Sequence, residues 1–445
     1  MLSMTLMAAA CGQAPTASPL IEALSSGETP LTPRMCAEAA VQAAPEVEEA
    51  LRQLTQAERA RAEQVVEWAP DVTVSGRVSR LAVEDASALG PVEVDVPSNR
   101  ASVELQVRQS LTDAVATIPA RVGAEGALVR AARARQDSVQ ADLTLRARED
   151  FWTLVRARGL TWVAEASKKA ASSQRDRVSS LLEAGLATPA DAAAADARLA
   201  KRQADVARRR ADRAVARDAL ALLIARPVPA SFAVPGQVLQ PPPPPGLPVL
   251  ALQEQALEDR SDLRVLTGQI EQARTLQKSA AAVGWPDLAV EGRATYAQPN
   301  LDAGLPREAF SGSATVGLGL RWSPDGLVAS RVRVARLRER VRELEARRRR
   351  MVRRIRTSVN QHTRGLRAAL ERLRPGRVEV DAASEAYRVR TVLFDNGNGL
   401  FSQVLAAEAD LERARQSFLS ALVDAHLARA RLDRELERGP GAVIP

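Results

Sequence analysis

The sequence repeats itself, and this internal duplication restricts the fold more than any other feature. At an offset of 216 residues, the pair Pro70-Asp71 falls on Pro286-Asp287. Further along, an offset of 212 residues places Gly185 on Gly397. Because the offset drifts so little, we expect two copies of one structural unit. The hydrophobic periodicity within each copy predicts the order helix, strand, strand, long helix, tip, helix.

This duplication divides the chain into five parts. Residues 1–34 form a signal-like start and N-terminal extension, 35–226 the first repeat, 227–247 a linker, 248–436 the second repeat and 437–445 a C-terminal tail. The linker is rich in proline and includes the run Pro241 to Pro245. Such a run excludes a helix or a central strand and favours an extended polyproline conformation.

Glycine interrupts the helical spacing at two tips, at about 183–190 and about 395–401, and proline follows it at the first. Glycine tolerates the positive φ that ends many helices, and proline fits the first turn of the next helix. Thr188 stands before Pro189, where its hydroxyl can cap that helix. The pattern predicts two sharp helical hairpins. Their tip residues are Gly185, Leu186, Thr188, Pro189, Gly397, Gly399 and Leu400.

Four segments alternate between apolar and polar residues, at about 71–84, 101–111, 286–297 and 313–322. Their length and alternation suit strands that cross a membrane. The residues expected to face lipid are Val103, Leu105, Val107, Val316, Leu318 and Leu320. Trp285, Tyr296 and Trp322 stand at strand ends, where an aromatic girdle belongs.

Strands in lipid must close into a barrel, and a barrel needs at least about eight of them. Four strands per chain therefore have to be pooled, and three copies would supply twelve. The alternative is a small soluble sheet that caps a helical bundle. Helices of about 65 residues, each about 100 Å long, favour an elongated antiparallel helical assembly.

From about residue 35 to 436 the chain resembles the TolC-like outer-membrane channels of drug efflux and type I secretion. The resemblance is carried by the duplication, by Pro-Asp at the start of each first strand, and by glycine tips followed by Ala/Asp-rich helices. It is also carried by Leu320-Arg321-Trp322 before Pro324-Asp325-Gly326, and by Arg260-Ser261-Asp262-Leu263, where the family has Pro for Ser261.

The resemblance implies a mainly α fold with a small β part, assembled as a homotrimer. Each copy would give four strands to a twelve-stranded transmembrane β-barrel in the cell outer membrane. A long antiparallel α-helical barrel would extend into the periplasm. The tips would dock on a periplasmic adaptor (membrane fusion) protein, which is joined to an inner-membrane RND, ABC or MFS pump.

In the family, acidic residues after the second tip surround the aperture and favour cations. The matching positions in this chain are Gln403 and Ala406, so the acidic ring is missing. Asp191 and Asp395 are candidate substitutes, and each also fits an ordinary cap or surface charge. We therefore expect an aperture that is less selective for cations.

The N-terminus looks like the end of a lipoprotein signal peptide. An apolar run from Leu2 to Ala10 precedes Cys11, which makes Cys11 a candidate for lipidation, although no Lys or Arg precedes the run. An ordinary apolar start is the alternative. If Cys11 is lipidated, Cys36, the second of the two cysteines, has no disulfide partner.

Other features of the sequence point away from an enzyme. The stretch Arg331 to Arg356 has 13 Arg and three Glu, but no aromatic residues for base stacking, so a solvated helix is favoured over a nucleic-acid site. His362 and His426 are expected on helix surfaces, and no metal, cofactor or catalytic motif stands out. The sequence therefore predicts a passive trimeric conduit. The alternative is a soluble, elongated coiled-coil scaffold whose basic helix could bind nucleic acid.

Overall fold

The computed structural model describes residues 19–80, 99–185, 187–298, 300 and 309–438. Cys11, Leu186 and the last part of the first predicted strand, 81–84, lie outside the described residues. The chain forms two compact units. The first takes in the described parts of Met1–Glu48, Asp137–Arg260 and Val352–Pro445, and the second takes in those of Glu49–Gln136 and Ser261–Met351. Each unit thus draws segments from both sequence repeats.

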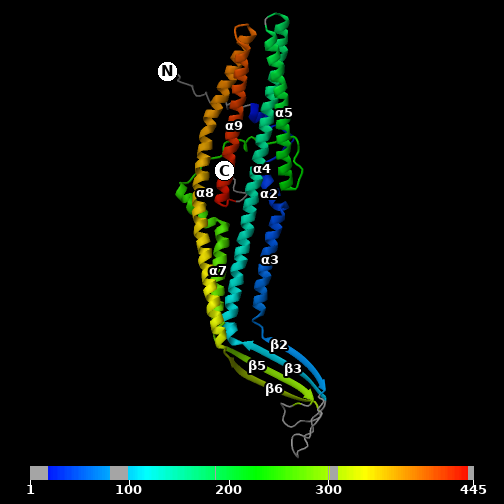
Figure 1. Cartoon of the computed structure of the whole chain (residues 1–445), viewed down its shortest axis with the longest axis vertical. Helices are drawn as coiled ribbons and strands as arrows, with labels where there is room; N and C mark the ends of the chain where they lie inside the picture. Colours follow the sequence, from blue (N-terminus) through cyan, green and yellow to red (C-terminus); the bar gives the residue numbers. More distant parts are fainter. Residues whose placement is uncertain (1–18, 81–98, 186, 299, 301–308, 439–445) are drawn as a thin grey trace, which may run out of the picture. The chain divides into compact units, whose positions relative to one another are not determined.

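Helices make up most of both units (Figure 1). The first unit holds α1 (Pro19–Ser25), α2 (Pro33–Ala43), α5 (Pro189–Ile224), α6 (Val249–Asp259) and α9 (Phe401–Glu435). The second holds α7 (Ser261–Ala282) and a short π-helix, η2 (Asp113–Thr117). Segments of α3 (Pro45–Val66), α4 (Ile118–Glu183) and α8 (Pro324–Asp395) belong to both units. With 66 and 72 residues, α4 and α8 are each on the order of 100 Å long.

The second unit contains a four-stranded antiparallel sheet. Its strands are β2 (Asp71–Arg80), β3 (Asn99–Ser110), β5 (Asp287–Gln298) and β6 (Ser311–Arg321), in the order β2-β3-β5-β6. The pairing of β3 with β5 joins the two sequence repeats. In the first unit, β1 (Thr29–Pro30) pairs in parallel with β4 (Phe232–Ala233), which lies in the Pro-rich linker.

The core of the first unit consists of apolar side chains from helices far apart in the sequence. Phe151 of α4, Leu220 of α5 and Leu419 of α9 are buried in one cluster. Gly159 permits the close contact between α4 and α9, because a Cβ added there would lie 2.5 Å from Leu419 Cδ2. This close packing fixes the first unit around α4.

Small residues also bring helices together in the second unit. Ile270 and Ala273 of α7 are buried with Val341 and Leu344 of α8. A Cβ on Gly268 would lie 2.9 Å from the Cβ of Ala131, so glycine allows α7 to approach α4. These contacts place α7 between its two long neighbours in this unit.

The predicted fold class is confirmed: the chain is mainly α with a small β part, and the predicted order of elements occurs twice.

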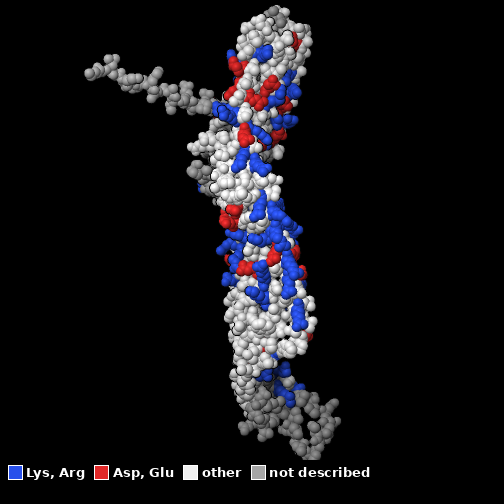
Figure 2. All heavy atoms as spheres, turned by 90° about the vertical axis from the view of Figure 1, so that its left-hand side faces the viewer, with Lys and Arg blue, Asp and Glu red and all other residues white. Residues whose placement is uncertain are grey.

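Among the described helices, none combines the length and the apolar character that crossing a bilayer requires. All 13 arginines of the stretch 331–356 are exposed on α8. Figure 2 shows a dense group of Lys and Arg, with fewer acidic residues among them, on the side that carries α8.

The expectation that both histidines lie on helix surfaces is wrong for His426. Its ring is partly buried and stacks on Trp152, with ring centroids 3.8 Å apart. Burial lowers the pKa of His426 to about 3. The surface prediction failed because Trp152 lies on another helix, which the local sequence around His426 does not reveal. In the described part of the chain, no three His, Cys, Asp or Glu residues are arranged to hold a metal ion.

Candidate functional site

The two hairpin tips, in the first unit, end their leading helices in the same way. Gly185 follows α4 with a φ of +76°, and Gly397 follows α8 with a φ of +74°. The N–H of Gly185 donates to Leu182 O, and the N–H of Gly397 donates to Phe394 O, both at 3.0 Å. This bond from the glycine N–H back into the last turn is typical of a helix that ends on a left-handed glycine.

The first tip starts its second helix with a capping box. The Asp191 N–H donates to Thr188 Oγ1 at 3.2 Å, and the Thr188 N–H donates back to Asp191 Oδ2 at 3.0 Å. Hydrogen bonds from Thr188 lower the pKa of the Asp191 carboxyl. Pro189 occupies the first turn, where a missing N–H costs nothing. The carboxylate of Asp191 is therefore engaged in holding the tip.

The second tip uses packing in place of a side-chain cap. Leu400 is the N-cap residue of α9 and makes no capping hydrogen bond. The rings of Phe394 and Phe401 lie 5.4 Å apart across the turn. Gly399 fits tightly beside them, since an added Cβ would lie 3.1 Å from the backbone nitrogen of Phe394.

The two hairpins contact each other at their tips. Val178 of α4, Ala195 of α5 and Phe401 of α9 are buried together. Arg177 Nη1 lies 2.8 Å from Asp395 Oδ1, which adds an ion pair between the hairpins. The tips of one chain therefore form one joined surface.

Each aperture candidate has a partner within its own chain. Asp191 caps α5, and Asp395 pairs with Arg177. Gln403 Oε1 accepts a hydrogen bond from Arg390 Nη1 at 2.7 Å. The structure thus gives all three side chains a local role.

In the second unit, the strand register places the predicted lipid-facing residues on one face of the sheet. Val316 lies opposite Gly292, Gly292 opposite Val107, and Val107 opposite Val72. Leu105, Val103, Leu318 and Leu320 have the same parity and share that face. In the single chain Val316 is 83% exposed, and Leu318 and Leu320 are each 73% exposed. An apolar surface therefore crosses all four strands without a break.

The opposite face of the sheet is polar and held by ion pairs between strands. Arg108 Nη2 lies 2.6 Å from Asp287 Oδ2, and Arg108 Nε lies 3.2 Å from Glu291 Oε1. Arg293 Nε lies 2.9 Å from Glu104 Oε1. One face is thus suited to water and the other to an apolar medium.

The three aromatic residues lie at the ends of the strands. Trp285 precedes β5 and Trp322 follows β6, and the pairing of Asp287 with Arg321 puts both at one end of the sheet. Tyr296 lies near the other end, where its ring stacks on Phe310 with centroids 5.4 Å apart. Aromatic residues therefore border the apolar face at both ends.

Solved structures share this arrangement of helices and strands. The outer-membrane channel OprN is 19% identical with a TM-score of 0.74, and the match covers 95% of this chain and 91% of OprN. VceC, an outer membrane protein of Vibrio cholerae, is 16% identical with a TM-score of 0.73 and coverages of 92% and 96%. The Campylobacter jejuni channel CmeC is 13% identical with a TM-score of 0.72 and coverages of 91% and 85%.

The chain has the TolC-like fold. The predicted resemblance is confirmed at this level. No sequence-family model and no curated protein matches the chain.

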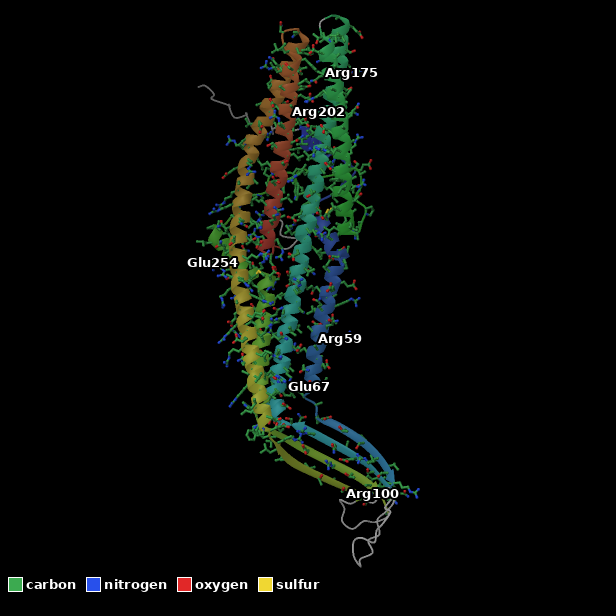
Figure 3. All side chains as sticks on the ribbon, in the orientation of Figure 1. Arg59, Glu67, Arg100, Arg175, Arg202 and Glu254 are labelled. Carbon is green, nitrogen blue, oxygen red and sulfur yellow. The ribbon has the colours of Figure 1, made fainter. Side chains whose placement is uncertain are left out.

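One buried polar cluster of this TolC-like chain was not predicted from the sequence. Arg202 of α5 (labelled in Figure 3) and Glu408 of α9 are only 5% and 3% exposed, and Arg202 Nη2 lies 3.3 Å from Glu408 Oε1. Arg198 Nη2 lies 3.3 Å from Glu408 Oε2, and Arg202 also pairs with Glu412. The cluster joins the second helices of the two hairpins.

A sequence signal for this cluster did exist. Phe401, Val404 and Leu411 mark the apolar side of a helix, and Glu408 occupies a position in that same spacing. A charged residue at an apolar position predicts a buried charge with a partner, because an isolated buried charge is very costly.

A cavity of about 420 Å³ lies beside the cluster, lined in part by Tyr387, Glu408, Glu412 and Arg415. The Tyr387 hydroxyl accepts a hydrogen bond from Gln174 Nε2 at 3.0 Å. Burial raises the pKa of Tyr387, so the phenol stays neutral. These groups form no nucleophile–base pair, and we assign the cluster a structural role within the TolC-like fold.

Proposed function

We propose that three copies of this chain assemble into a passive channel in the cell outer membrane. One observation carries this proposal: an exposed apolar face crosses four antiparallel strands, and both β2 and β6 are edge strands in the described chain. An apolar face needs a cover, and free strand edges need partners. Lipid would cover the apolar face, and neighbouring copies of the chain would pair with the strand edges.

The strand directions favour pooling between copies. Because all neighbours in β2-β3-β5-β6 are antiparallel, the two edge strands run in opposite directions. The β6 edge of one copy can therefore pair antiparallel with the β2 edge of the next. Such head-to-tail contacts close into a ring when the rotation between copies allows it. Three copies would give the twelve-stranded barrel that the resemblance implies.

The helical part would then extend into the periplasm as the wall of a conduit. The joined tips, from Gly185 to Pro189 and from Gly397 to Leu400, would dock on a periplasmic adaptor. That adaptor would connect the channel to an inner-membrane pump of the RND, ABC or MFS type. Both tripartite efflux and type I secretion fit this arrangement. Cargo would pass without chemical change, driven by the pump.

The soluble coiled-coil scaffold explains less. It gives no reason for an apolar face with Val316 and Leu318 largely exposed. A nucleic-acid role would have to rest on the α8 arginines alone, without aromatic stacking partners. The channel accounts for both the sheet and the long helices.

The test is the location and mass of the full-length protein after expression in a Gram-negative host. We expect it in the outer-membrane fraction and, after extraction in detergent, a protein mass of three chains by light scattering. A monomer that stays in detergent-free buffer would exclude the channel. Palmitate labelling of wild type and Cys11→Ser tests lipidation separately.

A further inference from the structure

Two arginine stripes run along the segment of α8 that belongs to the second unit. One consists of Arg331, Arg338, Arg342 and Arg349, and the other of Arg333, Arg336, Arg340 and Arg347. Spacings of three, four and seven residues keep each set on one side of a helix. All eight side chains are exposed.

A third side of α8 packs against its own chain. Val341 and Leu344 are buried with Ile270 and Ala273 of α7. Ser330 Oγ donates a hydrogen bond to Ala280 O at 2.8 Å on the same side. At about 100° per residue, the two arginine stripes lie roughly a quarter turn to either side of this packing face.

The fourth side carries small and apolar residues. Val328 and Val332 are exposed there, and Ala335 and Ala346 follow with helical spacing. This side lies opposite the packing face and suits contact with a neighbouring helix. In a closed ring of helices, each helix has neighbours on two opposite sides. Its remaining two sides form the inner and the outer wall.

The two stripes therefore lie on the inner-wall and outer-wall sides of α8. Whichever way α8 is turned in the ring, one stripe faces the interior. Arg342 pairs with Glu339, while Arg340 and Arg347 share Glu343. The stripe arginines without an ion pair among the described residues are Arg331, Arg333, Arg336, Arg338 and Arg349.

Two further acidic groups, one on α8 itself and one on α7, are already paired with other arginines. Glu345 binds Arg274, and Glu271 binds Arg130 at 2.6 Å. Guanidinium groups stay charged at any physiological pH. Whichever stripe faces inward, the part of the wall that α8 supplies keeps a positive charge, and every copy in the ring repeats it.

We propose that this channel is selective for anions and that its cargo belongs to the class of solutes bearing carboxylate, phosphate or sulfate groups. The inference rests on the proposed function, because a stripe lines an interior only when copies close into a ring. A narrow passage lined by one sign of charge concentrates ions of the opposite sign. Near the tips Gln403 is uncharged, and the two candidate aperture carboxylates there are engaged, because Asp191 caps α5 and Asp395 pairs with Arg177.

The experiment is the reversal potential of purified full-length protein in a planar bilayer under a potassium chloride gradient. We expect the wild-type permeability for chloride to exceed that for potassium by roughly threefold or more. Two variants change one stripe each to glutamine: Arg331→Gln, Arg338→Gln and Arg349→Gln together, and Arg333→Gln, Arg336→Gln and Arg347→Gln together. One variant should lose most of the selectivity, and the other should keep it.

Matched arginine-to-lysine variants keep the charge and should keep the selectivity, which separates charge from packing. A conducting wild-type channel that prefers potassium, or one that both glutamine variants leave unchanged, would overturn the proposal while leaving the channel function intact. A protein that never conducts would overturn the channel function and this inference together. Should a glutamine variant fail to insert, the wild-type permeability ratio at low and high salt decides, since selectivity from wall charge falls as salt rises.

Discussion

The guanidinium carbon of Arg158 lies 4.7 Å from the centre of the Phe232 ring. The same group donates hydrogen bonds to the carbonyls of Ala23 at 2.8 Å, Leu24 at 3.3 Å and Ser26 at 2.5 Å, and to that of Phe232. One side chain of α4 thereby holds the end of α1 and the strand β4 in the first unit. Both segments otherwise have little regular structure of their own.

Replacing Arg158 by methionine should lower stability by about 2–4 kcal/mol, because four carbonyls lose a charged donor. Lysine should restore only part of this, since it lacks the planar fork of donors. Arg156→Met is the matched control: Arg156 is partly exposed and pairs with the exposed Asp424, and its loss should cost less than about 1 kcal/mol. Thermal melting of the purified proteins measures the difference. Equal losses for Arg158→Met and Arg156→Met would refute the role of Arg158.

His426 should make stability depend on pH. Its pKa is lowered to about 3 in the folded protein, so between pH 3 and the ordinary value of 6.5 the unfolded chain binds more protons. The contribution of the neutral ring is complete above pH 6.5 and is lost as the pH falls through this window. At pH 5 the loss is about 2 kcal/mol.

His426→Phe keeps an aromatic ring on Trp152 and removes the titration. Its melting temperature should fall less than that of wild type between pH 7.5 and pH 5. His362→Gln serves as the control on a second partly buried histidine. If wild type and His426→Phe lose the same number of degrees, His426 does not set the acid sensitivity.

The buried pair of Arg202 and Glu408 predicts strong coupling between two substitutions. Arg202→Ala leaves the Glu408 carboxylate buried with Arg198 as its remaining close cation and should cost about 3–5 kcal/mol. Arg202→Met combined with Glu408→Leu replaces the pair with apolar groups and should recover most of that loss. A thermal double-mutant cycle measures the coupling. Additive effects would show that the two side chains act independently.

The two faces of β6 predict opposite tolerance for charge. Leu318→Arg places a cation on the apolar face and should cost about 2–4 kcal/mol of membrane assembly. Gly317→Arg, one residue away, places it on the polar face opposite Glu291, where an added Cβ meets open space. The amount of outer-membrane trimer on a native gel compares the two. Similar amounts of trimer from Leu318→Arg and Gly317→Arg would contradict the proposal that the apolar face contacts lipid.

Local patterns allowed the strands and tips to be predicted from sequence. Alternation over 313–322 indicated a strand, and β6 spans Ser311–Arg321. Gly185 and Gly397 indicated the tips because glycine adopts the positive φ that ends a helix more readily than other residues do. The duplication added strength, since each weak local signal occurred twice.

Contacts between distant segments could not be predicted in the same way. The pair Arg158–Phe232, the stacking of His426 on Trp152 and the short β1–β4 pair all join residues far apart in the sequence. Glu408 is the intermediate case: its place in an apolar spacing indicated burial, but the spacing does not name Arg202 as its partner.

The central claim is that copies of the chain pool their strands, and it predicts contact between β2 of one copy and β6 of the next. Within one chain these strands are separated by three strand spacings, about 14 Å. A disulfide requires Cα atoms within about 7 Å, so a cysteine in each strand cannot close inside one chain.

The decisive measurement is disulfide cross-linking of the assembled protein in the outer membrane. Cys36 is first changed to alanine, and Cys11 is changed as well where palmitate labelling shows that it carries no lipid. Ser75→Cys in β2 is then combined in turn with Ser313→Cys, Thr315→Cys or Gly319→Cys in β6, because the register between copies depends on the tilt of the barrel. Variants with a single cysteine are the controls. We predict that at least one combination gives a covalent trimer on a denaturing gel, and only monomers from every combination would contradict the account.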